Sequence, residues 1–260
     1  MPELLVDKQG HVTVLTLNRP EKMNAYDGAL VHQMEEAYQT FENDPDQYVL
    51  VVTGAGDRAF CTGSDFSSQK MEGRPRTDKM KSTDMWGVGS LSKPTIAAVN
   101  GAAIGGGLEI VLNCDIRIAS ENAYFGLFEP KRGIMAGVGV HLLPRNISWG
   151  DASLLLLACE RVDAHEAHRM GLVQKVVRPG GALEEAMRLA EQICKLSQVA
   201  VQSTKKVMSL HRNNLLDEGL NLSSMVHRMM YLSGDNVEGP KAFLEKREPN
   251  FRNRWADAQD

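Results

Sequence analysis

Three consecutive glycines, Gly105 to Gly107, stand just before Glu109 in the stretch GAAIGGGLEIVLNCD. The residues after the glycines suit a helix, and the backbone N–H groups of a helix's first turn have no partner within the helix, so they can bind an anion. Glycine at such a turn lets a ligand approach the backbone, because no Cβ stands in the way. An oxyanion hole has the same requirements. A tight turn with close packing explains the glycines equally well.

Two glutamates stand in apolar surroundings. Glu109 falls one turn into an otherwise apolar helix, where a buried carboxylate is costly unless it is hydrogen-bonded or functional. The alternative is an exposed acid that stabilises the helix dipole. Glu129 follows the segment YFGLF and precedes a glycine-rich turn at 133–139, a position that suits the lining of an apolar pocket. Two glutamates in one such pocket could have their pKa values pushed apart, so that one acts as base and the other as acid.

Several common functional motifs are absent. GAGDRAF lacks the GK[ST] ending of a P-loop, GAAIGGG is not GxGxxG, and no GxSxG surrounds a serine. HEAH, at His165 to His168, misses the HExxH spacing by one residue and fits a solvated helix face. The four cysteines have no metal-ligand spacing and are expected to be reduced and mostly buried.

The composition favours one large soluble unit. The 260 residues can bury a sizeable core, and a formal net charge of −4 gives no argument for nucleic acid or an acidic membrane surface. No signal peptide is indicated at the N-terminus, and the longest apolar cluster, 154–159, is far too short to span a bilayer. We expect a cytoplasmic protein that binds neither nucleic acid nor membrane.

Predicted strands and helices alternate, which is typical of an α/β fold. β-rich runs predict strands at 11–17, 48–54, 95–99, 115–120 and 172–177. Apolar residues at helical spacing predict a helix after Asp27, which suits an N-cap, and another helix begins at the glycine triplet. Further helices are predicted within 149–170, and the chain after 177 is almost wholly helical. The polar stretch 67–84 is either a surface excursion or a loop over a site.

Six blocks of the sequence follow one another over essentially the whole chain. They are LNRPEKMNAY, VVTGAGDRAFCTGSDF, KPTIAAVNGAAIGGGLEIVLNCDIRIAS, FGLFEPKRGIMAGVGV, RVDAHEAHRMGLVQKVV and EGPKAFLEKREPNF. In order and spacing these blocks resemble the crotonase superfamily and, within it, the enoyl-CoA hydratases.

The resemblance implies a spiral of ββα units over 1–195, which carries the active site, followed by a C-terminal helical region over 196–260. That region would pack on neighbouring subunits, usually in a homotrimer or a dimer of trimers. The implied substrate is an acyl-coenzyme A thioester. No metal and no cofactor other than the coenzyme A of the substrate is expected.

The resemblance also assigns roles to residues. Glu109 and Glu129 fall on the two catalytic glutamates of hydratases, with Glu109 activating water for addition at Cβ and Glu129 delivering a proton to Cα. The backbone amides of Ser64 and Gly106 fall on the oxyanion hole. Coenzyme A contacts are implied for Asn24, Ala25, Tyr26, Ser64, Asp65 and Phe66, and phosphate contacts for Lys22 and, from a neighbouring subunit, Lys246. At both lysines a solvated surface side chain is the alternative.

Members of the superfamily that catalyse other reactions differ at these same positions. Isomerases often keep only the second glutamate, so Glu109 favours hydration or its reverse. The turn after Glu129 lacks the aspartate of members that isomerise dienes or displace halide, and Phe128, Ala136 and Val140 depart from the usual hydratase pattern beside the acyl pocket. The alternatives to a hydratase are a hydroxyacyl- or carnitinyl-CoA dehydratase, an enoyl-CoA isomerase, an acyl-CoA hydrolase and a non-catalytic acyl-CoA-binding homologue.

Overall fold

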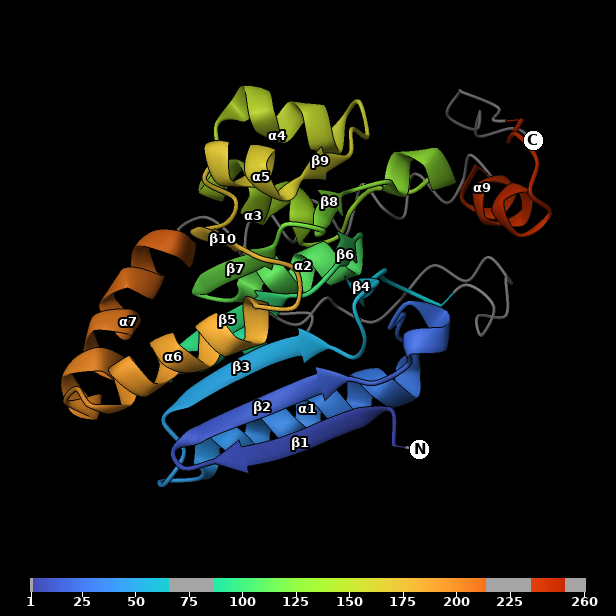
Figure 1. The fold of residues 1–260 in the computed structure, drawn as a ribbon. Helices are drawn as coiled ribbons and strands as arrows, with labels where there is room; N and C mark the ends of the chain where they lie inside the picture. Colours follow the sequence, from blue (N-terminus) through green and yellow to red (C-terminus); the bar gives the residue numbers. More distant parts are fainter. Residues whose placement is uncertain (1, 66–86, 214–234, 251–260) are drawn as a thin grey trace, which may run out of the picture.

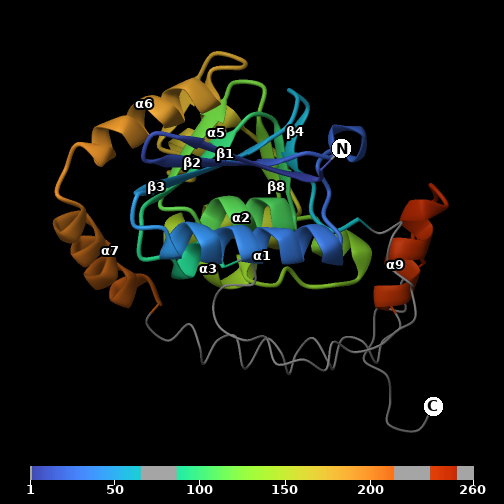
Figure 2. The same cartoon turned by 90° about the horizontal axis from the view of Figure 1, so that it is seen from below.

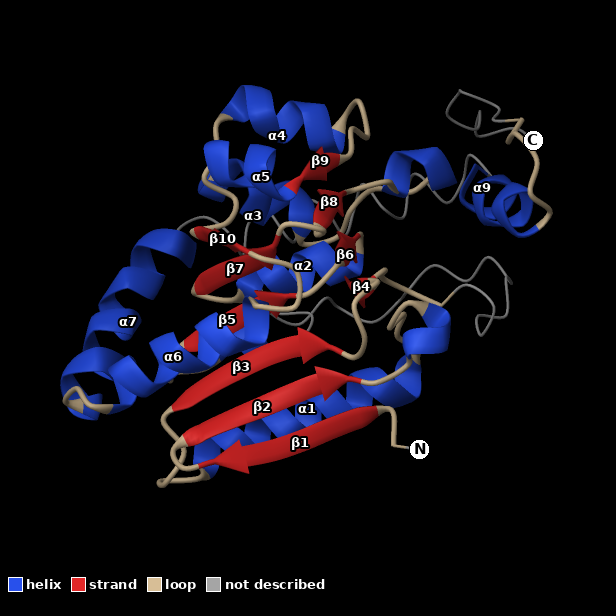
Figure 3. Ribbon diagram, in the orientation of Figure 1, coloured by secondary structure: helices blue, strands red, loops and turns tan. Residues whose placement is uncertain are grey.

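A six-stranded sheet contains the long strands of the fold (Figure 3). The computed structural model describes residues 2–65, 87–213 and 235–250. The strand order is β1-β2-β3-β5-β7-β10, with β1 and β2 antiparallel and the other neighbours parallel. The strands are β1 (Leu4–Gln9), β2 (Val12–Leu17), β3 (Val49–Gly54), β5 (Thr95–Val99), β7 (Ile116–Ser120) and β10 (Lys175–Val177).

Helices cover both faces of this sheet (Figures 1 and 2). On one face, Val14 and Val51 belong to an apolar cluster with Ala186 of α6 (Ala182–Cys194). On the other face, α1 (Gly28–Asn43) and α2 (Gly106–Asn113) complete the main core. Parallel strands buried on both sides read as continuous apolar runs, so these strands could be predicted from the sequence.

A second, four-stranded sheet has the order β4-β6-β8-β9. Its strands are β4 (Ala59–Cys61), β6 (Ala102–Ile104), β8 (Tyr124–Gly126) and β9 (Val162–Asp163). The chain passes from the large sheet to the small one after β3, β5 and β7, which confirms the expected spiral of ββα units. The pattern of residues alone did not predict these strands of two or three residues, because so short a run shows no periodicity.

The described residues also form five further helices and three short 3-10 turns. They are α3 (Gly139–Asn146), α4 (Trp149–Leu156), α5 (Ala164–Arg169), α7 (Gln198–Asn213) and α9 (Asp235–Leu244), with short 3-10 turns η1 (Pro20–Lys22), η2 (Val88–Ser90) and η3 (Glu129–Arg132). Figures 1 and 2 both place α7 and α9 on opposite sides of the fold. The division into 1–195 and 196–260 stays a prediction, and the stretch 67–84 lies outside the described residues.

The histidines of HEAH and the four cysteines lie in the surroundings that the sequence predicts. His165 and His168 are exposed on α5, and all four cysteines are free thiols, of which Cys61, Cys114 and Cys159 are buried. Within the described ranges, no cluster of three or more His, Cys, Asp or Glu side chains could hold a metal ion. No helix of the described part is long and apolar enough to cross a membrane.

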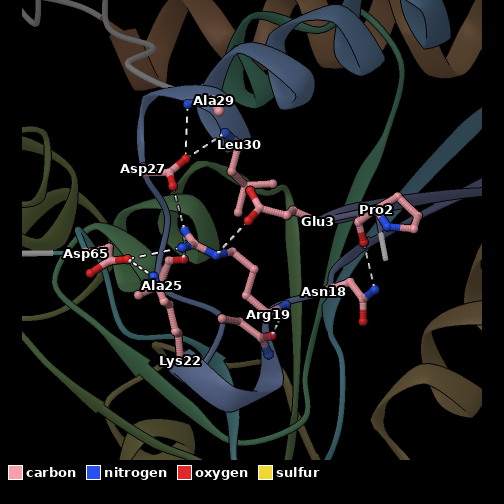
Figure 4. A network of polar contacts seen from close by, with 11 residues as sticks. Pro2, Glu3, Asn18, Arg19, Lys22, Ala25, Asp27, Ala29, Leu30 and Asp65 are labelled. Carbon is pink, nitrogen blue, oxygen red and sulfur yellow. Dashed lines mark hydrogen bonds and ion pairs between the residues drawn. The ribbon is translucent and has the colours of Figure 1, made fainter. Parts of the chain in front are cut away.

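Arg19 joins the end of the large sheet to the first helix and to the segment after β4 (Figure 4). Its guanidinium is almost fully buried and pairs with the carboxylates of Glu3 at 3.3 Å, Asp27 at 3.1 Å and Asp65 at 3.1 Å. Asp27 also caps α1, as predicted, by accepting hydrogen bonds from the N–H groups of Ala29 and Leu30. One buried cation therefore fixes three chain segments beside the start of α1.

Replacing Arg19 with alanine should lower the free energy of unfolding by about 3–5 kcal/mol, because the buried Asp65 carboxylate loses its buried partner and keeps the half-exposed Lys22. Urea unfolding followed by circular dichroism measures this change. The control is Lys8→Ala, which breaks the exposed pair with Asp44 and should change the free energy of unfolding far less. Equal effects of the two substitutions would contradict the role given to Arg19.

Candidate active site

The glycine triplet at the start of α2 is required by three different neighbours. Gly105 has a φ of +56°, and a Cβ there would lie 3.0 Å from Oε1 of Glu129. A Cβ on Gly106 would overlap the hydroxyl of Tyr26, and one on Gly107 would overlap the backbone carbonyl of Cys61. Close packing and an accessible backbone were alternatives in the sequence. The structure shows the close packing, and at Gly105 and Gly106 the packed groups are polar side chains.

Glu109 is buried in α2, with 2% of its surface exposed. Its Oε1 accepts a hydrogen bond of 2.8 Å from the N–H of Gly139, the first residue of α3. The partial positive charge at the N-terminus of a helix stabilises a carboxylate there. The alternative of an exposed, dipole-stabilising acid on its own helix is therefore wrong, and the buried, hydrogen-bonded alternative is confirmed.

Glu129 opens η3 and points its carboxylate towards the start of α2. Its Oε2 is buried and has no hydrogen-bond partner within the described part of the chain. Burial first, and the negative charge of Glu109 second, raise the pKa of Glu129 to about 8. Glu129 is therefore largely protonated at neutral pH and can act as an acid. Glu109, in contrast, accepts a hydrogen bond at the N-terminus of α3, which stabilises a negative carboxylate. The two glutamates occupy one site with different environments.

The amides of Ser64 and Gly106 lie close together at this site. Tyr26 and Ser64 form a short parallel bridge, in which the Tyr26 N–H donates to Gly63 O at 2.9 Å and the Asp65 N–H donates to Tyr26 O at 2.8 Å. The bridge leaves the N–H of Ser64 unused. A Cβ on Gly63 would lie 3.3 Å from the nitrogen of Gly106. Neither amide donates to another residue in the ranges that the structure describes, so both remain as donors beside the glutamates.

Residues predicted to contact coenzyme A form the frame beside these amides. The buried Asn24 side chain accepts a hydrogen bond from the Arg19 N–H at 3.0 Å and donates to Ala59 O at 2.8 Å. The carbonyl of Ala25 accepts a hydrogen bond from the guanidinium of Arg19 at 3.0 Å. The Asn24 side chain and the Ala25 carbonyl thus have structural partners, and the contact of both residues with coenzyme A stays a prediction.

The charged residues predicted to contact coenzyme A differ in exposure. Lys22 is half-exposed and its Nζ pairs with the buried Asp65 carboxylate at 2.8 Å. Lys246 is exposed just after α9. Nothing in a single chain tests its predicted contact from a neighbouring subunit. Phe66 lies outside the described residues.

Two contacts of the site were not predicted from the sequence. The first is the hydrogen bond from the N–H of Gly139 to Glu109, of which the glycine-rich turn before α3 gives no indication. The second is the side chain of Tyr26, a residue for which the family resemblance implies only a contact with coenzyme A. The one available signal was an aromatic residue directly before the helix cap Asp27.

Known proteins resemble this chain in sequence and in fold. A family model described as enoyl-CoA hydratase/isomerase matches residues 7–254. An (E)-benzylidenesuccinyl-CoA hydratase of Thauera aromatica is 40% identical, over 97% of this chain and 99% of its own. A solved carnitinyl-CoA hydratase from Mycobacterium avium has a TM-score of 0.88 at 34% identity, covering 97% of this chain and 99% of its own. A solved carnitinyl-CoA dehydratase from Mycobacterium avium 104 has a TM-score of 0.85 at 35% identity, covering 98% and 100%.

The raised pKa of Glu129 should make its replacement by glutamine stabilising at high pH. Between the ordinary pKa of 4.5 and the folded value of about 8, the unfolded chain releases a proton that the folded chain keeps. The contribution of Glu129 to stability therefore falls as the pH rises through this window. Urea unfolding should show Glu129→Gln more stable than the parent by roughly 1–3 kcal/mol at pH 9 and little changed at pH 5.

The exposed Glu121 provides the matched control, and Glu121→Gln should leave the free energy of unfolding unchanged at both pH values. A Glu129→Gln variant that is no more stable than the parent at pH 9 would contradict the environment assigned to this carboxyl.

Proposed function

The chain belongs to the enoyl-CoA hydratase/isomerase family, and we propose that it catalyses the reversible syn addition of water to a 2-enoyl-CoA thioester. One observation carries the proposal. The buried Glu109 and the half-buried Glu129, whose Oε2 is buried, come from different elements and meet at the start of α2, beside the amides of Ser64 and Gly106. Addition of water to a conjugated thioester needs a base, an acid and donors for a negative oxygen, and this site contains all three.

The two amides would hold the thioester oxygen. When water adds at Cβ, the double-bond electrons move onto that oxygen and form an enolate. Preformed N–H donors stabilise this charge without reorganising during the reaction, and losing one such donor typically costs about 3–4 kcal/mol of activation free energy. The location of Gly106 at the N-terminus of α2 adds the helix dipole to the same effect.

The glutamates would divide the proton transfers. Glu109 takes a proton from the attacking water as its oxygen bonds to Cβ, and Glu129 gives a proton to Cα as the enolate collapses. The raised pKa of Glu129 supports the second role, because the group still carries its proton near neutral pH. Each turnover leaves Glu109 protonated and Glu129 ionised, and exchange with solvent restores both.

A hydroxyacyl-CoA dehydratase is the second candidate. The same groups run the reaction in reverse, with Glu129 removing the Cα proton and Glu109 protonating the departing hydroxyl. The likeness to a solved carnitinyl-CoA dehydratase favours this candidate, and the likeness to a hydratase at 40% identity favours addition. The presence of both glutamates favours either over double-bond isomerisation.

We also propose that the chain assembles as a homotrimer or a dimer of trimers. Large apolar side chains are exposed on helices outside the sheets, among them Trp149 and Val199, at 77% and 80% exposure, and Phe243, at 49%. Exposed apolar surface of this kind is typical of subunit contacts. Light scattering should give a mass about three or six times that of the 28.7 kDa chain, and a monomer would contradict the proposal.

Glu109→Gln and Glu129→Gln should each lower the turnover number for hydration of crotonyl-CoA by about 10²- to 10⁴-fold, since each removes one proton transfer. Loss of the enoyl absorbance measures the rate, and oxygen from heavy-oxygen water in the product identifies hydration. Circular dichroism shows whether the fold is intact, and the exposed Glu121→Gln serves as control. Near wild-type hydration by Glu109→Gln would overturn the assignment.

A further inference from the structure

The side chain of Tyr26 points into the site and contacts both residues of the amide pair. It is buried, with 8% exposed, and its Oη accepts a hydrogen bond of 3.2 Å from the Oγ of Ser64. The same Oη lies against Gly106, where a Cβ would overlap it and would stand 2.8 Å from Cζ of the ring. The Tyr26 hydroxyl therefore lies beside both residues of the amide pair.

The backbone around Tyr26 fixes the ring in this position. Its N–H and C=O are both held by the bridge to the segment 63–65. The following residue, Asp27, caps α1 and pairs with the buried Arg19. The hydroxyl is thus presented by a rigid frame, which is the arrangement that a preorganised donor needs.

The surroundings keep the Tyr26 hydroxyl protonated. Burial first, and the negative charge of Glu109 second, raise the pKa of Tyr26 well above its ordinary value, and Glu129 adds in the same direction. The hydrogen bond from Ser64 has the opposite, smaller effect. A phenol that does not ionise cannot serve as a base here. It can donate a hydrogen bond to an oxygen that gains negative charge.

We propose that Tyr26 Oη donates a third hydrogen bond to the thioester oxygen, beside the amides of Ser64 and Gly106. This inference rests on the proposed function, because it takes an acyl-CoA thioester as the ligand. It extends that function by adding a side chain to a hole otherwise built from backbone. The Tyr26 hydroxyl keeps its proton throughout, so its own O–H bond is not broken.

The test uses butyryl-CoA labelled with carbon-13 at its carbonyl, a saturated thioester that cannot be hydrated. Binding to the parent protein should lower the carbonyl stretching frequency in difference infrared spectra, because hydrogen bonds polarise the C=O. Tyr26→Phe should lose part of this shift and should lower the turnover number for hydration of crotonyl-CoA about a hundredfold. Tyr38→Phe, at a buried tyrosine of α1, is the matched control and should change neither quantity.

A second comparison tests the contact with Ser64. Ser64→Ala removes Oγ and keeps the backbone amide, so its effect should pass through Tyr26. The double variant should therefore hydrate no more slowly than Tyr26→Phe alone, which is the non-additivity expected of groups in contact. Independent, additive losses would overturn the proposed coupling.

The outcomes separate the two proposals. Tyr26→Phe with an unchanged carbonyl frequency and unchanged turnover overturns the role of Tyr26 and leaves the hydratase proposal standing. A parent protein that binds butyryl-CoA with a lowered frequency but does not hydrate enoyl-CoA overturns the hydratase proposal, and the frequency of Tyr26→Phe then still decides the role of the hydroxyl. Failure of the parent protein to bind acyl-CoA overturns both.

Discussion

The close approach of three chain segments to the first turn of α2 is the constraint on which the site depends. Cys61 brings its carbonyl against Gly107, Tyr26 brings its hydroxyl against Gly106, and Glu129 brings its carboxyl against Gly105. A Cβ at Gly106 or Gly107 would overlap the group that faces it, and a side chain at Gly105 would be strained by the positive φ there. The same turn therefore fixes the small sheet, the second glutamate and the amide pair relative to one another.

The charged groups around Arg19 are paired with one another, whereas the carboxyl of Glu129, which is proposed to act on the substrate, is not paired within the described part of the chain. Arg19 is buried among three carboxylates, and Lys22 adds a fourth contact to the same network. In contrast, the half-buried Glu129 has a raised pKa, and its buried Oε2 has no hydrogen-bond partner among the residues that the structure describes. A buried carboxyl without a partner lowers the stability of the folded state, and such groups are concentrated at sites that act on a substrate. This contrast supports Glu129 as a functional residue independently of the family.

Buried strands and the cap of α1 could be predicted from the sequence, because their signals lie in neighbouring residues. Buried strands such as β3 and β5 are apolar runs, and Asp27 caps its helix through bonds to the next few residues. The strands of the small sheet are too short for such a signal, and β1, at the edge of the large sheet, is exposed at every residue after Leu4 and ends in three polar residues. The family resemblance, rather than periodicity, predicted the ββα spiral.

The candidate site was only partly predictable because its contacts are non-local. Glu109 could be recognised as unusual, but its burial depends on α3, whose first N–H reaches it from a residue 30 positions away. The sequence likewise gave no reason to place the Tyr26 hydroxyl against Gly106, since that contact forms only when the segment before α1 meets α2. The pairing of Glu109 with Glu129 requires β7 and β8 to return the chain to the start of α2.

A crystal structure of the protein with butyryl-CoA tests the central claim most directly, namely that one pocket at the start of α2 holds a thioester for the two glutamates. We expect the thioester oxygen within hydrogen-bond distance of the nitrogens of Ser64 and Gly106, with the carboxyl of Glu109 facing Cβ and that of Glu129 facing Cα. A thioester bound away from these amides, or with both carboxyls directed elsewhere, would contradict the account.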